Sequence, residues 1–581
     1  MTWHQSIDPA NNLIVSAIWA SLPVIFLIIA LAVLKLKGYV AGILTLVIAM
    51  LIAIIIFAMP AELTVFSSLY GILFGLIPVG WIVLMAVFLY NLTVESGEFN
   101  IVKDSILTIT EDRRIQALLI AFAFGAFLEA IAGFGTPVAI TAAMLAGIGF
   151  KPFYAAGICL IANTAPVAFA AVGIPIITAG AVSSMDPALI GQMAGRQLAL
   201  FSVFVPFWLI FIMAGWKATK EVMPAILATG LSYGLVLLLT SHYLGPELPG
   251  ILSALASIVS LIILLKYWKP ETIWKFEGED IKPHKAFNYN SLQVAKAWSP
   301  FIIVTILITN WGLTPVRNML ELATLKISFN TLNRIVLPDG SLLEAVYQLN
   351  LLATTGTSIF IATVISAFIL GLKPESFFKI FLKTLNELKY ALITIACFLG
   401  FAYVANWSGM TATLGAVFTI AGPVYPFISP LLGWLGVFIT GSDTSSNALF
   451  CNLQRVTAEA TGVNPVLTVA ANTTGGCAAK MISPQSLAVA TSSTGLSGQE
   501  SALFRFTLPH SILFVVFIGL ITILMAYVFP WMAPDKSVDA LSLNIPEFIN
   551  GPVILFISFL IIFISGFYLS KVSSGSSKTD S

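Results

Sequence analysis

Three ionisable side chains stand inside apolar stretches of this sequence, where a charge is costly. Glu129 lies within residues 127–137, Asp443 lies among the hydroxyls and the amide of residues 441–447, and Lys480 lies in a third stretch. A charge at the middle of a bilayer costs about 2.5–3.5 kcal/mol on insertion scales, so such groups are expected to be paired, protonated or in contact with water. A carboxyl in this setting can gain and lose a proton. The alternative is a structural ion pair between Lys480 and Asp443.

Two short polar motifs, Asn163-Thr164 and Asn472-Thr473, accompany these charges. Pro166 follows the first motif, and Gly475 and Gly476 follow the second. Proline removes a backbone donor and glycine loosens the chain, so we expect each motif to interrupt a helix. The half-helix that follows such a break presents N–H groups and a dipole that attract an anion. The alternative is that the breaks only kink helices for packing. The sequence therefore predicts a binding site for a small carboxylate, built from Asn163, Thr164, Asn472, Thr473, Gly475, Lys480 and Ser442.

Of the two carboxyls, Glu129 is the slightly favoured proton carrier and Asp443 the second candidate. A close pair between Lys480 and Asp443 would keep Asp443 ionised and leave the proton to Glu129. Arg196 and Arg505 fall at the predicted mouths of helices. There they could act at a gate or an interface, or simply face lipid headgroups.

The composition describes the elements that must position these residues. Of 581 residues, 58% are hydrophobic and 9% are charged, whereas soluble domains carry roughly 25% charged residues. The apolar residues form runs of about 20, the length of a membrane-spanning helix. The net charge of +1 does not point to nucleic acid as a partner. No cofactor motif, metal-ligand pattern or nucleophile motif occurs in the sequence, so we expect a multi-pass helical membrane protein and not an enzyme.

The distribution of basic residues predicts the topology. Thirteen apolar segments read as full crossings, and residues 114–148 and 411–450, broken by Gly, Ser, Thr and Pro, read as re-entrant hairpins. With the N-terminus outside, the cytoplasmic connections hold 19 Lys and Arg and the external ones hold 4. This split obeys the positive-inside rule. The predicted fold class is an all-α polytopic membrane protein with about 12–14 transmembrane helices.

An internal repeat divides the chain. Residues 162–175 (ANTAPVAFAAVGIP) resemble residues 471–484 (ANTTGGCAAKMISP) at an offset of 309, and Arg196 precedes Arg505 by the same distance. The crossing at 38–59 runs outward and its counterpart at 350–371 runs inward by the charge count, so the repeats are predicted to be inverted. Inverted repeats with interrupted helices in matching positions are typical of secondary transporters.

These boundaries give a complete predicted organisation. It comprises an N-terminal helix (1–37), a first repeat (38–215) with broken segments 114–148 and 153–180, a helix pair (216–266), a cytoplasmic connector (267–297), a helix with an external loop (298–349), a second repeat (350–530) with broken segments 411–450 and 464–493, and a C-terminal helix with its tail (531–581).

Several long polar motifs carry a resemblance to a known family. They include GAFLEAIAGFG at 125–135, GQMAGRQL at 191–198, GWLGVFITGSDTSSNALF at 433–450 and MISPQS at 481–486. The chain is similar, nearly end to end, to the bacterial L-lactate permease family. The resemblance implies a proton-coupled importer of L-lactate, with D-lactate and glycolate as further substrates, in the bacterial cytoplasmic membrane. Its partners would be such 2-hydroxy monocarboxylates, protons and the lipid bilayer. The resemblance assigns no residue roles.

Two other functions fit parts of the sequence. The oxygen-rich run 442–447 could bind sodium, so the residues alone do not decide between proton and sodium coupling. An anion channel would need a continuous polar pore, whereas broken helices favour an occluded site.

Overall fold

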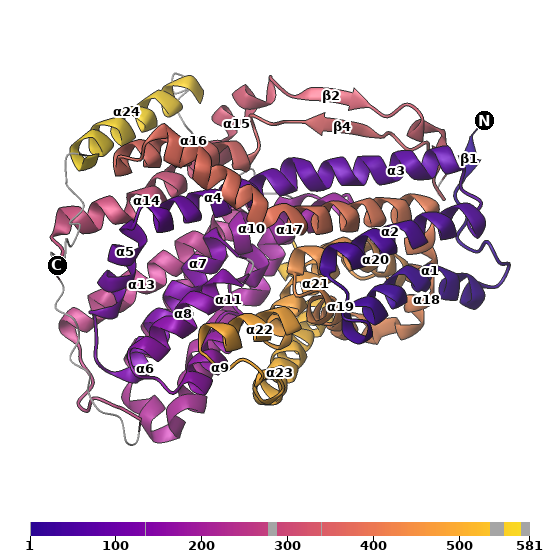
Figure 1. Ribbon diagram of the computed structural model, residues 1–581. Helices are drawn as coiled ribbons and strands as arrows, with labels where there is room; N and C mark the ends of the chain where they lie inside the picture. The colour runs from indigo at the N-terminus through magenta and orange to yellow at the C-terminus, as the bar shows by residue number, and fades with distance from the viewer. Residues whose placement is uncertain (1, 134, 277–287, 339, 535–550, 571–581) are drawn as a thin grey trace.

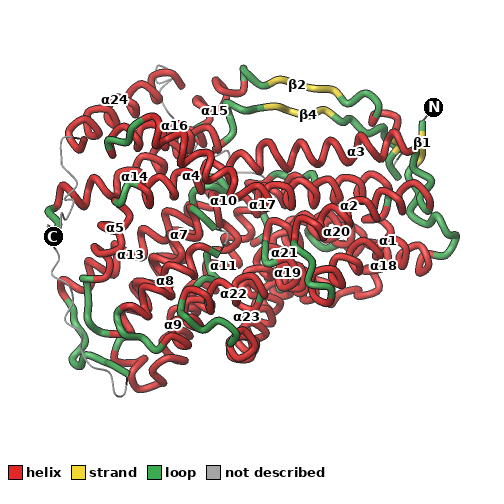
Figure 2. Tube along the Cα trace, in the orientation of Figure 1, coloured by secondary structure: helices red, strands yellow, loops and turns green. Residues whose placement is uncertain are grey.

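The computed structural model describes residues 2–133, 135–276, 288–338, 340–534 and 551–570, most of them helical (Figure 1, Figure 2). In this part of the chain twelve helices are long and apolar enough to cross a bilayer. A thirteenth span results if Pro152–Ala162 and Val167–Ser183, which are bent by 68°, are counted together. The predicted class, an all-α polytopic membrane protein, is confirmed. Parts of the predicted connector 267–297 and of the C-terminal segment 531–581 lie outside the described residues.

The first half of the chain is helical apart from one short strand, β1 (Trp3–His4). Its helices are α1 (Leu13–Ile28), α2 (Gly38–Ile55), α3 (Ala61–Phe74), α4 (Trp81–Glu95), α5 (Glu98–Leu107), α6 (Arg113–Gln116), α7 (Gly125–Ile131), α8 (Thr136–Gly147), α9 (Pro152–Ala162), α10 (Ala170–Ser183), α11 (Pro187–Glu221), α12 (Met223–Tyr243) and α13 (Pro249–Tyr267).

The second half is also mainly helical and contains a small β-structure. Its helices are α14 (Ser291–Gly312), α15 (Thr314–Glu321), α16 (Thr355–Leu370), α17 (Pro374–Ser408), α18 (Met410–Phe418), α19 (Tyr425–Thr440), α20 (Asp443–Thr461), α21 (Pro465–Ala479), α22 (Pro484–Ser493), α23 (Glu500–Tyr527) and α24 (Gly551–Ser570). Strand β2 (Leu325–Ser328) pairs antiparallel with β4 (Val346–Leu349), and β3 (Ile335–Val336) pairs in parallel with β1.

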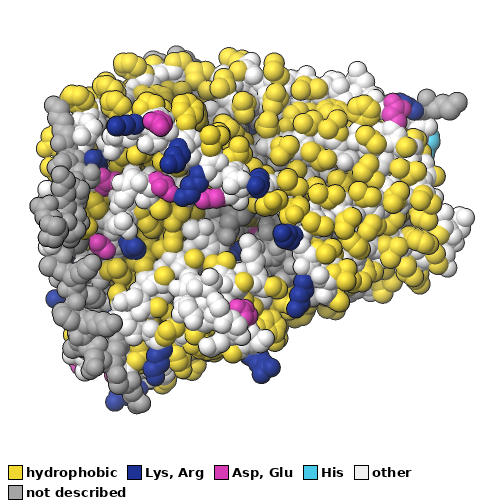
Figure 3. Space-filling view, in the orientation of Figure 1, with side chains coloured by type: hydrophobic (Ala, Val, Ile, Leu, Met, Phe, Trp, Pro, Cys, Tyr) yellow, Lys and Arg dark blue, Asp and Glu magenta, His cyan; other side chains and the backbone are white. Residues whose placement is uncertain are grey.

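The lateral surface is apolar, as the composition requires. Large side chains such as Leu51, Leu235 and Phe563 are at least half exposed on helices that could span a bilayer. Figure 3 shows hydrophobic side chains over most of the visible face, with Lys and Arg mainly toward the end where the chain terminates. An exposed apolar surface of this extent is stable only in contact with lipid.

The segment 114–148 folds back on itself as a helical hairpin, and its re-entrant placement in the membrane stays a prediction. One arm runs from α6 through a π-helical stretch, Ala117–Phe124, into α7, and the other arm is α8. The turn contains Gly135 with a φ of +84°, a backbone conformation that glycine adopts without a steric penalty. Arg113 Nη2 donates to the carbonyl of Ile148 at 2.6 Å. The two ends of the segment therefore meet, as a re-entrant hairpin requires.

The second hairpin is displaced from the predicted range of 411–450. Its arms are α19 and α20, which pack against each other, and α18 is separated from α19 by a kink at Gly422. The polar run after Gly441 begins a helix because the Ser442 side chain accepts the backbone N–H of Ser445 as an N-cap. That helix continues past residue 450 until Gly462 ends it with a φ of +71°.

The interrupted helices differ between the halves. In the first half the break falls where the motif predicts it, because α9 ends at Ala162 and the chain bends before α10. In the second half α21 continues through Asn472, and the predicted break there is wrong. A 3₁₀ turn at Lys480–Ile482 interrupts the chain instead.

Close packing explains why the glycines of α21 do not break it. A Cβ added at Gly475 would lie 2.1 Å from the carbonyl oxygen of Pro430 on α19, and one at Gly433 would lie 1.8 Å from that of Asn472. Small residues at helix contacts let backbones approach closely in membranes. Packing, the alternative interpretation of these glycines, therefore accounts for Gly475.

Helices in equivalent places of the two halves pack reciprocally. Helix α2 contacts α17, and its counterpart α16 contacts α4; α10 contacts α20 while α22 contacts α8; α11 contacts α21 while α23 contacts α9. Figure 1 shows the resulting interleaving, with the early helices α2 and α3 beside the late helix α17. This exchange of partners is expected of two-fold related repeats. Their inverted orientation stays a prediction.

Candidate functional site

Four buried polar side chains from both halves form an interior cluster. Glu129 lies on α7, Asn163 follows the end of α9, Asp443 begins α20 and Lys480 follows the end of α21; all are at most 5% exposed. Asn163 Nδ2 donates to Glu129 Oε2 at 3.2 Å. The Lys480 charge interacts with both carboxyls. The fold thus brings together the three ionisable residues and the first motif asparagine that the sequence singled out.

Lys480 does not form the predicted ion pair with Asp443. Its ammonium group donates to the carbonyl oxygen of Gly441 at 2.7 Å, at the turn of the second hairpin. Within the described residues no carboxylate oxygen lies within ion-pair distance of Lys480. The reason for preferring Glu129 over Asp443 as the proton carrier therefore disappears.

Unsatisfied polar atoms mark this cluster as a site. Within the described residues, neither carboxyl oxygen of Asp443 has a hydrogen-bond partner, and Asn163 Oδ1 also lacks one. Buried polar atoms in folded proteins nearly always have a partner, so exceptions call for an explanation such as a ligand or a proton. The Asp443 carboxyl lies against α21 at Gly476, where an added Cβ would be 2.3 Å from Oδ1.

Tyr233 on α12 extends this set. Its side chain is fully buried, its hydroxyl has no partner within the described residues, and it lies close to Glu129 and Cys477. The sequence offered no signal for Tyr233, because a tyrosine in an apolar helix is usually a packing residue.

Asn472 and Thr473 belong to a separate, satisfied network. Asn472 Nδ2 and Thr473 Oγ1 both donate to Asn447 Oδ1, at 2.9 and 3.1 Å, and Gln454 Nε2 donates to Asn472 Oδ1 at 3.1 Å. Asn447 in turn donates to the carbonyl of Pro175 on α10. These bonds use the donors that the sequence assigns to a substrate, so in this conformation the motif links α20, α21 and α10. The spacing of Asp443, Asn447 and Gln454 on one face of α20 was the available signal.

The other predicted site residues have local partners. Thr164 Oγ1 donates to the carbonyl of Ile161, and Ser442 caps α20. Arg196 donates to the carbonyl of Met532, and Arg505 is exposed on α23. The structure therefore does not place Arg196 or Arg505 in the interior cluster, and their gating or interface role stays a prediction.

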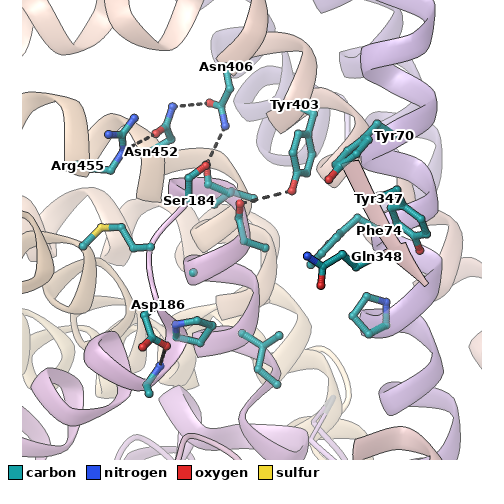
Figure 4. Close-up of a pocket in the computed structure, with 18 of the residues that line it drawn as sticks. Tyr70, Phe74, Ser184, Asp186, Tyr347, Gln348, Tyr403, Asn406, Asn452 and Arg455 are labelled. Carbon is teal, nitrogen blue, oxygen red and sulfur yellow. Dashed lines mark hydrogen bonds between the residues drawn. The ribbon is translucent and has the colours of Figure 1, made fainter. Parts of the chain in front are cut away.

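A large cavity opens at one end of the molecule. Its volume is about 1110 Å³, and its wall includes residues of the connections 1–12, 181–195, 242–247, 317–349 and 407–410. The charge count places seven connections outside, namely these five together with 60–68 and 531–550, so the structure gathers five of the predicted external connections at one mouth. Figure 4 shows Tyr70, Tyr347 and Tyr403 on one side and Asn406, Asn452 and Arg455 on another. We call this cavity the vestibule.

A charge network around a buried arginine lies outside the vestibule wall. Arg114, which is fully buried, pairs with Asp112 at 2.7 Å and Glu221 at 2.8 Å and donates to the carbonyl of Thr272. Asp112, Glu221 and Thr272 lie in residues 93–113, 216–221 and 266–297, three connections that the charge count places in the cytoplasm.

A buried polar cluster between two hairpins, within a bundle of helices that are long and apolar enough to span a membrane, is typical of a membrane transport protein. The comparisons identify its family: a model for "L-lactate permease" matches residues 16–529, and the chain belongs to that family.

Curated relatives agree over nearly the whole chain. The L-lactate permease of Bacillus subtilis is 49% identical over 92% of this chain and 100% of its own length. The glycolate permease GlcA of Escherichia coli is 49% identical over 92% and 99%, and the L-lactate permease of Escherichia coli is 45% identical over 92% and 100%.

Two solved structures have a similar arrangement at low identity. MtrF of Neisseria gonorrhoeae covers 77% of this chain and 81% of its own at 13% identity and a TM-score of 0.42. The YdaH transporter of Alcanivorax borkumensis covers 81% and 90% at 14% identity and a TM-score of 0.44.

Proposed function

We propose that this protein imports L-lactate, and also D-lactate and glycolate, together with protons across the bacterial cytoplasmic membrane. Support comes from relatives that are named L-lactate and glycolate permeases and match the chain over 92% of its length. These substrates share a carboxylate and a hydroxyl on the neighbouring carbon. An enclosed site with one cation and several neutral polar groups suits that chemistry.

The observation that carries the proposal is the Asp443 carboxyl, which is buried close to Lys480 and has no donor to either oxygen among the residues that the structure describes. The substrate carboxylate would bind Lys480 and the amide of Asn163, and the unpartnered Tyr233 hydroxyl would bind the substrate hydroxyl. Asp443 or Glu129 would carry the proton. Each group then performs one step: Lys480 neutralises the anion, the amide and phenol orient it, and a carboxyl moves the proton.

Electrical balance gives the reason for coupling. Moving an anion into a compartment at −100 mV costs about 2.3 kcal/mol, a factor of roughly 50 in the equilibrium accumulation ratio. One accompanying proton removes this cost, because the pair crosses without net charge.

The sodium alternative has less support from the geometry. In the oxygen-rich run, Ser442 accepts the N–H of Ser445, Ser446 donates to the carbonyl of Gly433, and Asn447 Oδ1 accepts two donors. A sodium ion needs several oxygens directed at one point. The side chains of Ser442, Ser446 and Asn447 are engaged elsewhere, and the Asp443 carboxyl, which has no hydrogen-bond partner within the described residues, does not make such a site by itself.

Uptake of labelled lactate into proteoliposomes tests the proposal. A proton gradient, acid outside, is expected to drive accumulation above the external concentration, and a sodium gradient is not. Accumulation with sodium alone would establish the alternative. Equilibration without accumulation under either gradient would indicate a channel, and absence of any lactate or glycolate uptake by the purified protein would refute the substrate assignment.

A further inference from the structure

Arg455 lies in the vestibule and outside the interior cluster. It sits on α20 together with Asp443, twelve residues further along the helix. At 1.5 Å per residue this separation is about 18 Å along the axis. A substrate of six heavy atoms cannot contact both residues at once. Arg455 therefore has no part in the interior site described above.

A chain of hydrogen bonds fixes the Arg455 side chain at the vestibule wall. Its Nε donates to Asn452 Oδ1 at 3.1 Å, Asn452 Nδ2 donates to Asn406 Oδ1 at 2.8 Å, and Asn406 Nδ2 donates to the carbonyl of Val182 at 2.8 Å. The chain links α20 to α17 and α10 (Figure 4). A guanidinium held through Nε presents its two terminal nitrogens in a fixed direction.

Glu459 shows that the terminal nitrogens of Arg455 can bind a carboxylate. Arg455 Nη1 donates to Glu459 Oε1 at 2.8 Å, while within the described residues Nη2 has no hydrogen-bond partner. The pair is of the i,i+4 type, and Glu459 is 49% exposed. Exposed pairs of this kind shift an equilibrium by only about twofold. A carboxylate that enters the vestibule can replace Glu459 at little cost and bind both terminal nitrogens.

The vestibule contains a second arginine that provides a comparison. Arg317 pairs with Glu321 at 2.9 Å, also as an i,i+4 pair, but its side chain is 66% exposed against 30% for Arg455. Arg317 stands on the short helix α15, and in the described part of the chain no row of amides of the kind that holds Arg455 is bonded to it. Arg317 and Arg455 carry the same charge and lie in the same cavity. Of these two, only the Arg455 side chain is held in a fixed orientation by described residues, and such preorganisation distinguishes a binding site from a diffuse positive charge.

We propose that Arg455, oriented by Asn452, forms an outer binding site that captures monocarboxylate anions such as lactate before they pass to the interior cluster. The inference rests on the proposed function, since the site matters only if carboxylates are carried. Capture at Arg455 raises the occupancy of the vestibule at low substrate concentration and leaves the interior steps unchanged.

The test measures lactate influx into proteoliposomes as a function of concentration. Arg455→Gln is expected to raise KM about ten- to hundred-fold, the range for one hydrogen bond between charged groups, with the maximal rate nearly unchanged. Glu459→Gln is expected to lower KM by about twofold because it removes the internal competitor. If the Arg455–Glu459 ion pair has only a structural role, Arg455→Gln and Glu459→Gln both break it. Both variants would then raise the KM for lactate by a similar factor.

Two further measurements complete the test. Arg317→Gln, the matched control, is expected to leave KM within twofold, and an increase equal to that of Arg455→Gln would overturn the site in favour of general electrostatics. Efflux driven from the side opposite the vestibule is expected to keep its KM in Arg455→Gln. If the unaltered protein carries lactate and Arg455→Gln has a normal influx KM, only the outer site fails; if the unaltered protein carries no carboxylate, the proposed function fails first.

Discussion

Replacing Asp443 by asparagine tests the centre of the mechanism. Both carboxyl oxygens are buried and lack donors within the described residues. Each buried unsatisfied group costs about 1–3 kcal/mol, so an ionised Asp443 would cost roughly 2–6 kcal/mol before the attraction of Lys480 is counted. A neutral side chain lowers this cost, because burying a neutral polar group without a partner costs less than burying a charge. Asp443→Asn keeps the size of the side chain, and we expect the variant to fold and reach the membrane at the normal level.

The expected effect is on coupling and not on binding. With one proton carried per lactate, a gradient of one pH unit changes the accumulation ratio about tenfold. We expect the accumulation ratio of the unaltered protein in proteoliposomes to change by this factor. Asp443→Asn is expected to exchange labelled for unlabelled lactate at a comparable rate but to show an accumulation ratio near one whatever the pH gradient, because its amide cannot release a proton.

Two variants serve as references for Asp443→Asn. Glu98→Gln alters another buried carboxyl, one that lies 3.7 Å from Lys296 and outside the interior cluster, and it should remain coupled. Glu129→Gln removes the competing candidate, whose carboxyl already accepts the Asn163 amide. If Asp443→Asn still accumulates lactate about tenfold per pH unit while Glu129→Gln does not, the reasoning from unsatisfied oxygens is refuted and Glu129 is the carrier.

Three other predictions follow from the same geometry. A cysteine at Glu62, which is exposed near the vestibule end, should react with an impermeant maleimide in intact cells, whereas one at Glu375 should react only after permeabilisation; the reverse pattern would contradict the topology. Asn163→Ala should weaken lactate affinity about ten- to hundred-fold at normal protein levels, as a binding titration would show. Asn472→Ala should mainly lower thermal stability, as a melting curve would show. Tyr233→Phe should raise KM for lactate more than for propionate, which lacks the hydroxyl; equal effects would remove Tyr233 from the substrate site.

The sequence could predict the fold class and the interior cluster because both depend on residues that are conspicuous where they stand. A carboxylate or lysine in an apolar run is costly enough to indicate a site by itself. The network of Asn447, Gln454 and Asn472 could not be predicted, because it depends on which helices become neighbours. The sequence shows donors and acceptors, but only the packing of α19, α20 and α21 decides whether they satisfy one another.

The alignment of the two Asn-Thr motifs paired residues whose positions along their helices differ by one helical turn. Asn163 and Asn472 are 309 residues apart, whereas the helices that contain them, α9 and α21, begin at Pro152 and Pro465, 313 apart. Asn163 is therefore the twelfth residue counted from Pro152, and Asn472 is the eighth from Pro465. Four residues are about one turn of helix. The first asparagine consequently lies at the break beside Glu129, and the second remains inside a continuous helix.

The position of Lys480 explains how substrate and proton can be linked without a permanent ion pair. Its ammonium group binds the carbonyl of Gly441 at the negative end of α19, while Asp443 stands in the first turn of α20, at the positive end of that helix dipole. Each charge is thus supported by a helix end and stays available to a ligand. In the proposed mechanism, a substrate carboxylate bound to Lys480 would cancel the positive field that favours ionisation of the nearby carboxyls, so the bound anion would favour proton binding. By linkage, the bound proton favours the anion to the same degree, which is the condition for carrying both together.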